Sequence, residues 1–144
     1  MTERDSEWEI YDYCDHRVIN VIEDWLTNDL EVPERARVLR KLDALRKNGP
    51  DLSSELLSDT PFPHIKKIRV NGRVAPRLLL CRGPVDMGAR EFTLLFGCTE
   101  RDRKFVPPNA ITRAEENRKF VIADPLKRRV KRVFEESPEE PAER

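Results

Sequence analysis

The sequence predicts an α+β fold in which helices pack on one face of a small antiparallel sheet, with a cationic site on or beside the other face. Three observations support this class: two amphipathic helical stripes in the first third of the chain, three β-type runs separated by turns, and a proline-initiated helical pattern after them. The chain has 144 residues, enough for one core and too few for two. We therefore expect one domain over residues 1–134 and a disordered, acidic, proline-containing tail over residues 135–144.

The N-terminal region predicts a strand followed by a hairpin of two helices. Residues 8–13 alternate in part between apolar and polar side chains, which is typical of a short strand. Apolar residues then recur at spacings of three and four from Asp15, the expected N-cap, to Asn28. A second stripe begins at Pro33, which suits a first helical turn, and ends near Asn48. The short connection predicts that these two helices are antiparallel.

The middle of the chain predicts a three-stranded antiparallel meander. Residues 50–64 contain three prolines and are expected to form mostly a surface loop. Asn71-Gly72 and the turn-rich segment 82–88 are short enough to join antiparallel neighbours. The expected strands cover residues 65–70, 75–81 and 91–98.

The C-terminal region predicts one helix on the sheet and a shorter one after it. Pro107-Pro108 marks the start of the first helix, in which Ile111, Ala114 and Phe120 are the expected sheet contacts, and Pro125 ends or kinks it. Residues 126–134 predict a short helix with an apolar side and five cations around the rest. Three roles stay open for this segment: an RNA-binding appendage, a cover for the sheet edge, or a solvated helix.

Several classes of protein are excluded by the composition. The longest apolar runs fall well short of the ~20 residues of a membrane-spanning helix, and no apolar segment follows the charged N-terminus, so we expect a cytoplasmic protein. The three cysteines, Cys14, Cys81 and Cys98, form no Cys-x-x-Cys pair and lie at no ligand-like interval from a histidine. We expect reduced cysteines, no metal site and no cofactor.

The net charge of zero conceals a strongly uneven distribution of charge. Residues 1–34 contain 11 acidic and 2 basic side chains, whereas residues 61–134 contain 7 acidic and 18 basic ones. A basic segment of this size indicates a surface for a polyanion, most often a nucleic acid. The alternative is that these cations are merely solvated on element surfaces.

The predicted strands carry cations that alternate in a definite pattern. Lys67 and Arg69 point to one face of their strand, Lys66 points to the other, and Arg77 lies in the middle of the next strand among leucines. Further cations are expected beside this sheet surface, so that the cluster outlines a phosphate site: Arg73, Arg101, Arg103 and Lys104.

Four local patterns follow one another along residues 7–122: Trp8-Glu9-Ile10-Tyr11, Lys67-Ile68-Arg69, Pro76-Arg77-Leu78-Leu79, and Leu94-Leu95-Phe96-Gly97 followed by a basic stretch and a helix with Ile111, Ala114 and Arg118. In this order they resemble the RelE/ParE superfamily of type II toxins, and most closely its HigB-like, phage-derived branch. The resemblance implies a RelE-like fold and ribosome-dependent endoribonuclease activity on mRNA. It also implies a cognate antitoxin, commonly a helix-turn-helix protein, and no membrane partner.

The chemistry of RNA cleavage suggests a role for each cation. The RNA 2′-hydroxyl attacks the adjacent phosphorus once a base removes its proton, cations stabilise the phosphorane, and an acid protonates the leaving oxygen. Arg77 and Arg69 suit charge stabilisation, because guanidinium binds phosphate oxygens in a fork. Lys67 positions phosphate or acts as the base. Arg101, Arg103 and Lys104 resemble the family's basic stretch, in which one residue often acts as acid or transition-state clamp, and the chemistry does not choose among them. With Arg103 taken for that role, the catalytic set is Lys67, Arg69, Arg77 and Arg103, and the RNA-binding set is Lys66, Arg73, Arg101 and Lys104.

Two other functions remain open at this stage. The family nucleases often have a tyrosine or histidine near the last strand or helix, whereas here the tyrosines are Tyr11 and Tyr13 and the last histidine is His64. His64 is either a substitute for that group or an exposed loop histidine without a catalytic role. This difference favours a RelE/ParE-fold inhibitor without nuclease activity, with gyrase or another enzyme as target. A basic nucleic-acid-binding module without a toxin role also accounts for the charge distribution.

Overall fold

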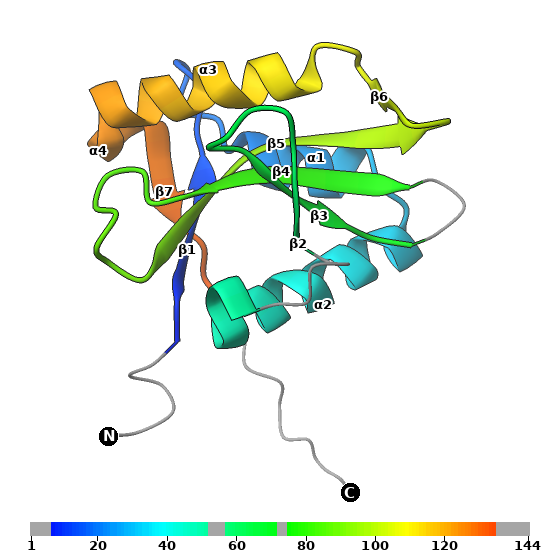
Figure 1. The fold of residues 1–144 in the computed structure, drawn as a ribbon, viewed down its shortest axis with the longest axis horizontal. Helices are drawn as coiled ribbons and strands as arrows, with labels where there is room; N and C mark the ends of the chain where they lie inside the picture. The colour runs from blue at the N-terminus through cyan, green and yellow to red at the C-terminus, as the bar shows by residue number, and fades with distance from the viewer. Residues whose placement is uncertain (1–6, 52–56, 72–74, 135–144) are drawn as a thin grey trace, which may run out of the picture.

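The computed structural model describes residues 7–51, 57–71 and 75–134, and within these ranges the chain forms a mixed α+β fold (Figure 1). The helices are α1 (Val21–Asn28), α2 (Val32–Asn48), the 3-10 turn η2 (Gly49–Asp51), α3 (Ala110–Ala123) and α4 (Pro125–Arg128). The strands are β1 (Glu9–Tyr13), β2 (Leu57–Asp59), β3 (Lys66–Arg69), β4 (Pro76–Arg82), β5 (Glu91–Arg101), β6 (Lys104–Val106) and β7 (Arg129–Lys131). None of the helices in the described ranges is both long and apolar enough to cross a bilayer.

All the described strands join one sheet in the order β2-β3-β4-β5-β1-β7, with β6 paired to β5. The predicted meander is confirmed, because β3, β4 and β5 pair antiparallel in sequence order. The expectation of an antiparallel sheet is wrong at one place, since β1 pairs with β5 in parallel. Turn chemistry predicts only hairpin neighbours, whereas β1 reaches β5 through a crossover that contains both N-terminal helices.

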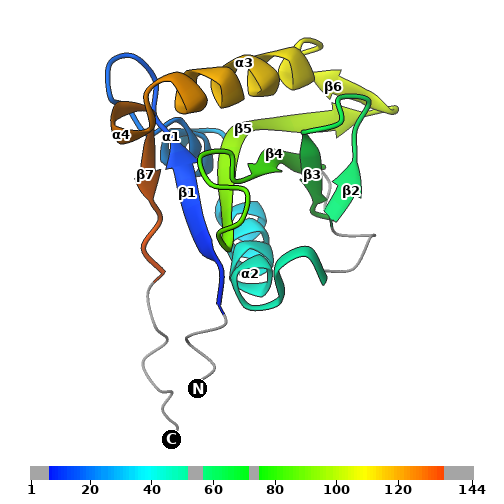
Figure 2. The same cartoon turned by 60° about the vertical axis from the view of Figure 1, so that its left-hand side comes forward.

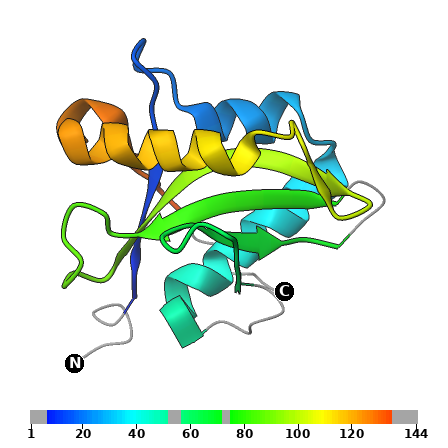
Figure 3. The same ribbon diagram turned by 45° about the horizontal axis from the view of Figure 1, so that its top comes forward.

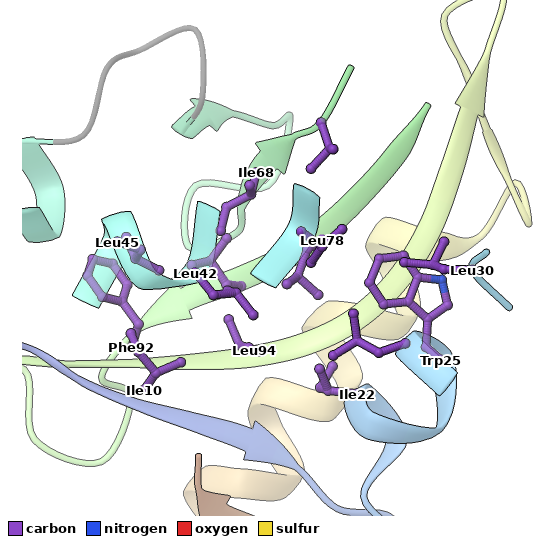
Figure 4. Packing of buried hydrophobic residues seen from close by; sticks show 14 residues of the cluster. Ile10, Ile22, Trp25, Leu30, Leu42, Leu45, Ile68, Leu78, Phe92 and Leu94 are labelled. Atoms are coloured by element: carbon purple, nitrogen blue, oxygen red, sulfur yellow. The ribbon is translucent and has the colours of Figure 1, made fainter. Parts of the chain in front are cut away.

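Helices α1 and α2 cover one face of the sheet and enclose the larger core cluster (Figure 4). Ile22, Trp25 and Leu26 of α1 and Val38, Leu42 and Leu45 of α2 are buried there, as their spacing predicts. The Trp25 indole lies directly on Gly97 of β5, where an added Cβ would overlap the ring. Glycine at this position therefore allows α1 to approach the sheet closely.

Helix α3 covers the opposite face, so the molecule has helices on both sides of the sheet (Figure 2). Ala110 and Ala114 pack there against Leu79, Cys81 and Leu95, and Ile111 lies beside them. The contacts predicted for Ile111 and Ala114 are confirmed, whereas the one predicted for Phe120 is wrong, because its ring is exposed and lies under the Arg128 guanidinium. The expectation that helices leave the second face free is wrong, and only the part of that face beyond α3 can hold the predicted cations.

The first helix begins later than its apolar spacing predicts. Asn20, not Asp15, is the N-cap, and its side chain accepts a hydrogen bond of 2.8 Å from the Glu23 N–H. Asp15 instead folds the preceding loop, because its Oδ1 accepts hydrogen bonds from the backbone of Arg17 and Ile19. Two competing caps lie five residues apart, and the spacing of apolar residues does not distinguish them.

The last elements differ from the predicted short helix over residues 126–134. Helix α4 is a single turn, after which β7 pairs antiparallel with β1 at the sheet edge (Figure 1). The predicted loop over residues 50–64 also contains a short edge strand, β2. Strand β7 is held by pairing with β1 at the other end of the chain, which local patterns do not reveal, whereas β2 pairs with β3, the next strand in sequence. The predicted tail over residues 135–144 lies outside the described residues.

Candidate nucleic-acid interface

The strand register brings three of the predicted site residues to one face of the sheet. Arg69 and Arg77 are directly opposite each other on β3 and β4, and Lys67 lies two residues from Arg69 on the same side. Arg77 is opposite Cys98 of β5, so Glu100 continues along that face. The alternation of side chains predicted for Lys67 and Arg69 is therefore confirmed, and a carboxylate is added to the cluster.

Lys67, Arg77 and Glu100 form an ion-paired group that we call the strand triad. Glu100 Oε1 accepts a hydrogen bond of 2.7 Å from Arg77 Nε and one of 3.3 Å from Lys67 Nζ. The three side chains are only 10–17% exposed, so water screens these charges weakly. Arg77 Nη1 also donates to the carbonyls of Val70 and Pro76, which fixes the plane of the guanidinium.

Protonation in the triad follows from these contacts. Burial raises the pKa of the Glu100 carboxyl, but the hydrogen bond from Arg77 and the charge of Lys67 outweigh it and leave the pKa below its usual value. Glu100 is therefore ionised at neutral pH. Neighbouring Cys98 is different, because burial raises its pKa to about 12.

All three cysteines are free and buried, as expected for reduced thiols. Burial also raises the pKa of Cys81 to about 12 and raises that of Cys14. Since the thiolate is the nucleophile, none of these side chains is suited to attack a substrate at neutral pH.

An aromatic ring lies against the triad. Phe105 of β6 is opposite Glu100 in the sheet register, and Lys67 Nζ lies 5.3 Å from the centre of its ring. The ring is half-buried, with part of it accessible to a ligand. Single-stranded RNA is commonly held by stacking of its bases on rings of this kind.

Further cations lie at the turn between β5 and β6, which projects from one end of the sheet (Figure 3). Arg101, Arg103 and Lys104, which we call the hairpin-tip cations, are all exposed. Asp102 and Arg103 have φ values of 51° and 66°, as both central residues of a type I′ turn require. Arg101 and Lys104 are paired with each other in the register and alternate with Glu100 and Phe105, so their side chains point to the face of the hairpin opposite the triad.

The remaining predicted residues are divided between two surfaces. Arg69 is exposed, and neither it nor a hairpin-tip cation has an ion-pair partner within the described residues. Lys66 lies on the opposite face of β3 and pairs with Asp59 of β2, so it is separate from this site. Arg73 lies outside the described residues.

The cations of residues 127–132 are mostly engaged inside the molecule, against the idea of an RNA-binding appendage. Arg129 contacts buried Glu91 at 2.9 Å, and Arg132 contacts buried Asp12 at 2.9 Å. Lys131 pairs with Glu9, while Arg128 donates to the Tyr13 hydroxyl. Covering the sheet edge is the role that these contacts support. They also show why the uneven charge along the chain is a poor guide to its surface, because acidic β1 and basic β7 pair with each other.

His64 lines a separate pocket of about 350 Å³ beside β2 and β3. Its lining combines apolar side chains such as Met87 and Phe92 with the cations Lys66, Arg82 and Arg118, and includes no member of the triad. Arg118 is held there by two hydrogen bonds of 2.9 Å to Glu115. His64 is thus not placed to replace a catalytic group at the strand triad.

Glu100 and Phe105 are the site residues that sequence reasoning missed. The strand was expected to end at Cys98, whereas β5 continues to Arg101 and pairs with β6. The positive-φ pair Asp102-Arg103 forms that hairpin without glycine or asparagine, so the usual sequence signal of a tight turn is missing. Cys98 is opposite Arg77, and side chains two residues apart in a strand share a face. If the strand had been extended past Cys98, this alternation would have placed Glu100 beside Arg77.

No group of three or more metal-binding side chains is present in residues 7–51, 57–71 and 75–134.

Comparison of the chain with protein-family models, curated proteins and solved structures finds no match.

Proposed function

We propose that this protein is the toxin of a type II toxin-antitoxin system and cleaves mRNA on the ribosome. The observation that carries the proposal is the gathering of Lys67, Arg69 and Arg77 on one sheet face, near the end of β5 that leads into the hairpin-tip cations. The order of strand, two helices, meander and helix is also the order that the RelE/ParE resemblance implies. A RelE-like fold is part of this proposal.

The arrangement suits a reaction in which RNA supplies its own nucleophile. Arg77 is held rigidly by two backbone carbonyls and Glu100, so its guanidinium is preorganised for a phosphate. Arg69, opposite it, supplies a second guanidinium that has no partner in the described residues. The hairpin-tip cations bind neighbouring phosphates, and Phe105 stacks with a base. In this mechanism, the cations stabilise the phosphorane charge.

The proposal is tested by inducing the chain alone in growing cells. Growth arrest is expected, with loss of full-length mRNA, and co-expression of a small helix-turn-helix protein encoded beside it is expected to restore growth. Cells that grow normally would contradict a toxin role. Ribosome dependence is tested by blocking translation initiation, which should protect the transcripts.

A second candidate function is an inhibitor of a nucleic-acid enzyme, such as gyrase, built on the same fold without nuclease activity. The favouring observation is that Lys67 and Arg77 already share a carboxylate, which occupies the place where a phosphate would bind. Arrest with intact transcripts and unchanged translation would support this alternative and contradict cleavage.

A further inference from the structure

The strand triad contains a carboxylate that a simple phosphate-binding site does not need. Glu100 lies between two cations and is only 16% exposed, so it brings a negative charge to the place where an RNA phosphate would bind. Such a charge weakens phosphate binding. Its presence in a site that binds RNA therefore calls for a chemical role that offsets this cost.

Resting on the proposed function, we propose that Glu100 is the general base of RNA cleavage and that Lys67 is the general acid. Both hydrogen bonds from the cations end on Oε1, so Oε2 has no partner among the described residues. That oxygen is the one that can take a proton from the RNA. The carboxylate is ionised at neutral pH, as a base must be.

The reaction balances with these two groups. Glu100 Oε2 removes the 2′-hydroxyl proton, the 2′-oxygen forms a bond to phosphorus, and the bond from phosphorus to the 5′-oxygen breaks. The ammonium of Lys67 gives a proton to the departing oxygen, which leaves a 2′,3′-cyclic phosphate and a 5′-hydroxyl. Glu100 Oε1 and Lys67 Nζ are 3.3 Å apart, within reach for the proton to return after the products leave.

Arg77 cannot take the role of base, because a guanidinium stays protonated in proteins. Cys98, the neighbouring thiol, has a pKa of about 12 and donates a hydrogen bond to the Arg77 carbonyl. Tyr11 and Tyr13 lie on β1, where Tyr13 is bonded to Arg128 and Tyr11 to Glu9. Among the described side chains at this face, the carboxylate of Glu100 is therefore the base that the geometry supports.

The test separates RNA binding from RNA cleavage in the variant Glu100→Gln. Gln keeps an oxygen for the Arg77 hydrogen bond and removes both the negative charge and the base. Binding is measured with a 2′-O-methyl copy of a defined mRNA, and cleavage is measured by primer extension on ribosomes translating the unmodified mRNA. We expect binding at least as tight as that of the wild type and cleavage slower by about 10²-fold or more. The control is Glu116→Gln, at an exposed position of α3, which should change neither RNA binding nor cleavage.

The outcomes are distinct. A Glu100→Gln protein that cleaves as fast as the wild type, or faster, overturns the role of Glu100 and leaves the proposed function intact. A wild-type protein that cleaves no mRNA overturns both. If thermal unfolding shows that Glu100→Gln does not fold, Glu100→Asp keeps the charge for both cations and withdraws the carboxylate by one methylene. Its cleavage should then fall by about 10²-fold with binding unchanged, and unchanged cleavage would overturn the proposal.

Discussion

Arg77 shows how one side chain combines a structural and a chemical role. Its guanidinium donates hydrogen bonds to the carbonyls of Val70, just after β3, and of Pro76, the first residue of β4. It also donates a hydrogen bond to Glu100. A lysine also has three donors, but they lie on one rotating nitrogen, so it lacks the planar fork that holds these acceptors in a fixed arrangement. The side chain is 10% exposed, so its aliphatic part also contributes packing.

We expect Arg77→Ala to lower cleavage by about 10²-fold or more, because it removes a fixed donor from a step in which charge develops. Stability should also fall, since Glu100 loses a partner in a partly buried site. Cleavage and thermal unfolding are therefore measured on the same preparation. Arg17→Ala, an exposed arginine paired with Asp15, is the control and should change neither. Full cleavage by a folded Arg77→Ala protein would remove Arg77 from the site.

Between the elements, the β1–β7 edge depends on ion pairs that are buried. Arg129 and Glu91 are 10% and 7% exposed, and Arg129 also lies 3.7 Å from the centre of the Tyr11 ring. Removing one member of such a pair leaves an uncompensated charge, which costs far more than the loss of an exposed pair.

Arg129→Ala should therefore destabilise the protein by about 3 kcal/mol, as measured by urea unfolding. Lys131 lies on the same strand as Arg129 but forms an exposed ion pair with Glu9. Lys131→Ala should therefore cost less than ~1 kcal/mol in unfolding free energy. Adding Glu91→Gln to Arg129→Ala should restore part of the loss, because the unpaired carboxylate is removed. Equal effects of the two single substitutions would contradict this account of the edge.

The contact between α1 and β5 depends on the absence of a side chain at Gly97. Gly97→Ala places a methyl group where the Trp25 ring lies and should cost about 1–3 kcal/mol in unfolding experiments. Gly88→Ala is the matched control, because its Cβ meets only the Asp86 carboxylate at 3.4 Å. A neutral Gly97→Ala substitution would show that Trp25 can move away at no cost.

The β5–β6 hairpin is expected to bind RNA phosphates without contributing to the core. Replacing Arg101 and Lys104 by Gln and Arg103 by Asn, which tolerates a positive φ, should leave the unfolding midpoint unchanged. The slope of log affinity against log salt should fall in magnitude by about 0.7 for each phosphate of single-stranded RNA that the variant no longer neutralises. Triple neutralisation of Arg17, Lys119 and Lys127, exposed elsewhere, is the control. An unchanged slope in the hairpin variant would show that the tip does not touch RNA.

At the scale of the whole molecule, acidic and basic parts of the sequence neutralise each other in space. The acidic N-terminal region supplies Glu9, Asp12 and Glu23, and the basic C-terminal region supplies Lys131 and Arg132 to meet them. Within the described residues, the cations that have no ion-pair partner are fewer than the basic segment of the sequence suggests. Some of them are Arg69 and the hairpin-tip cations. Surface charge thus depends on the fold more than on the order of charges along the chain.

The same distinction explains which features could be predicted. Local rules of turn and period predicted the meander and the shared face of Lys67, Arg69 and Arg77, since neighbouring strands are joined by short turns. They missed Glu100 because the tight turn after β5 has no glycine or asparagine, so the strand was expected to end at Cys98. They failed for the parallel pairing of β1 and for β7. Those features depend on contacts between residues far apart in sequence, which alternation within one segment does not contain.

Cleavage of a defined mRNA in a purified translation system shows whether this protein is a ribosome-dependent endoribonuclease. The wild-type protein should cut the message only when ribosomes translate it, and the upstream fragments should end in a 2′,3′-cyclic phosphate. Arg77→Ala, folded and at the same concentration, should leave the message nearly intact, while Arg17→Ala should cut like the wild type. The opposite result would be an mRNA that stays whole while ribosomes translate it in the presence of wild-type protein that arrests growth in cells. That result would contradict ribosome-dependent cleavage.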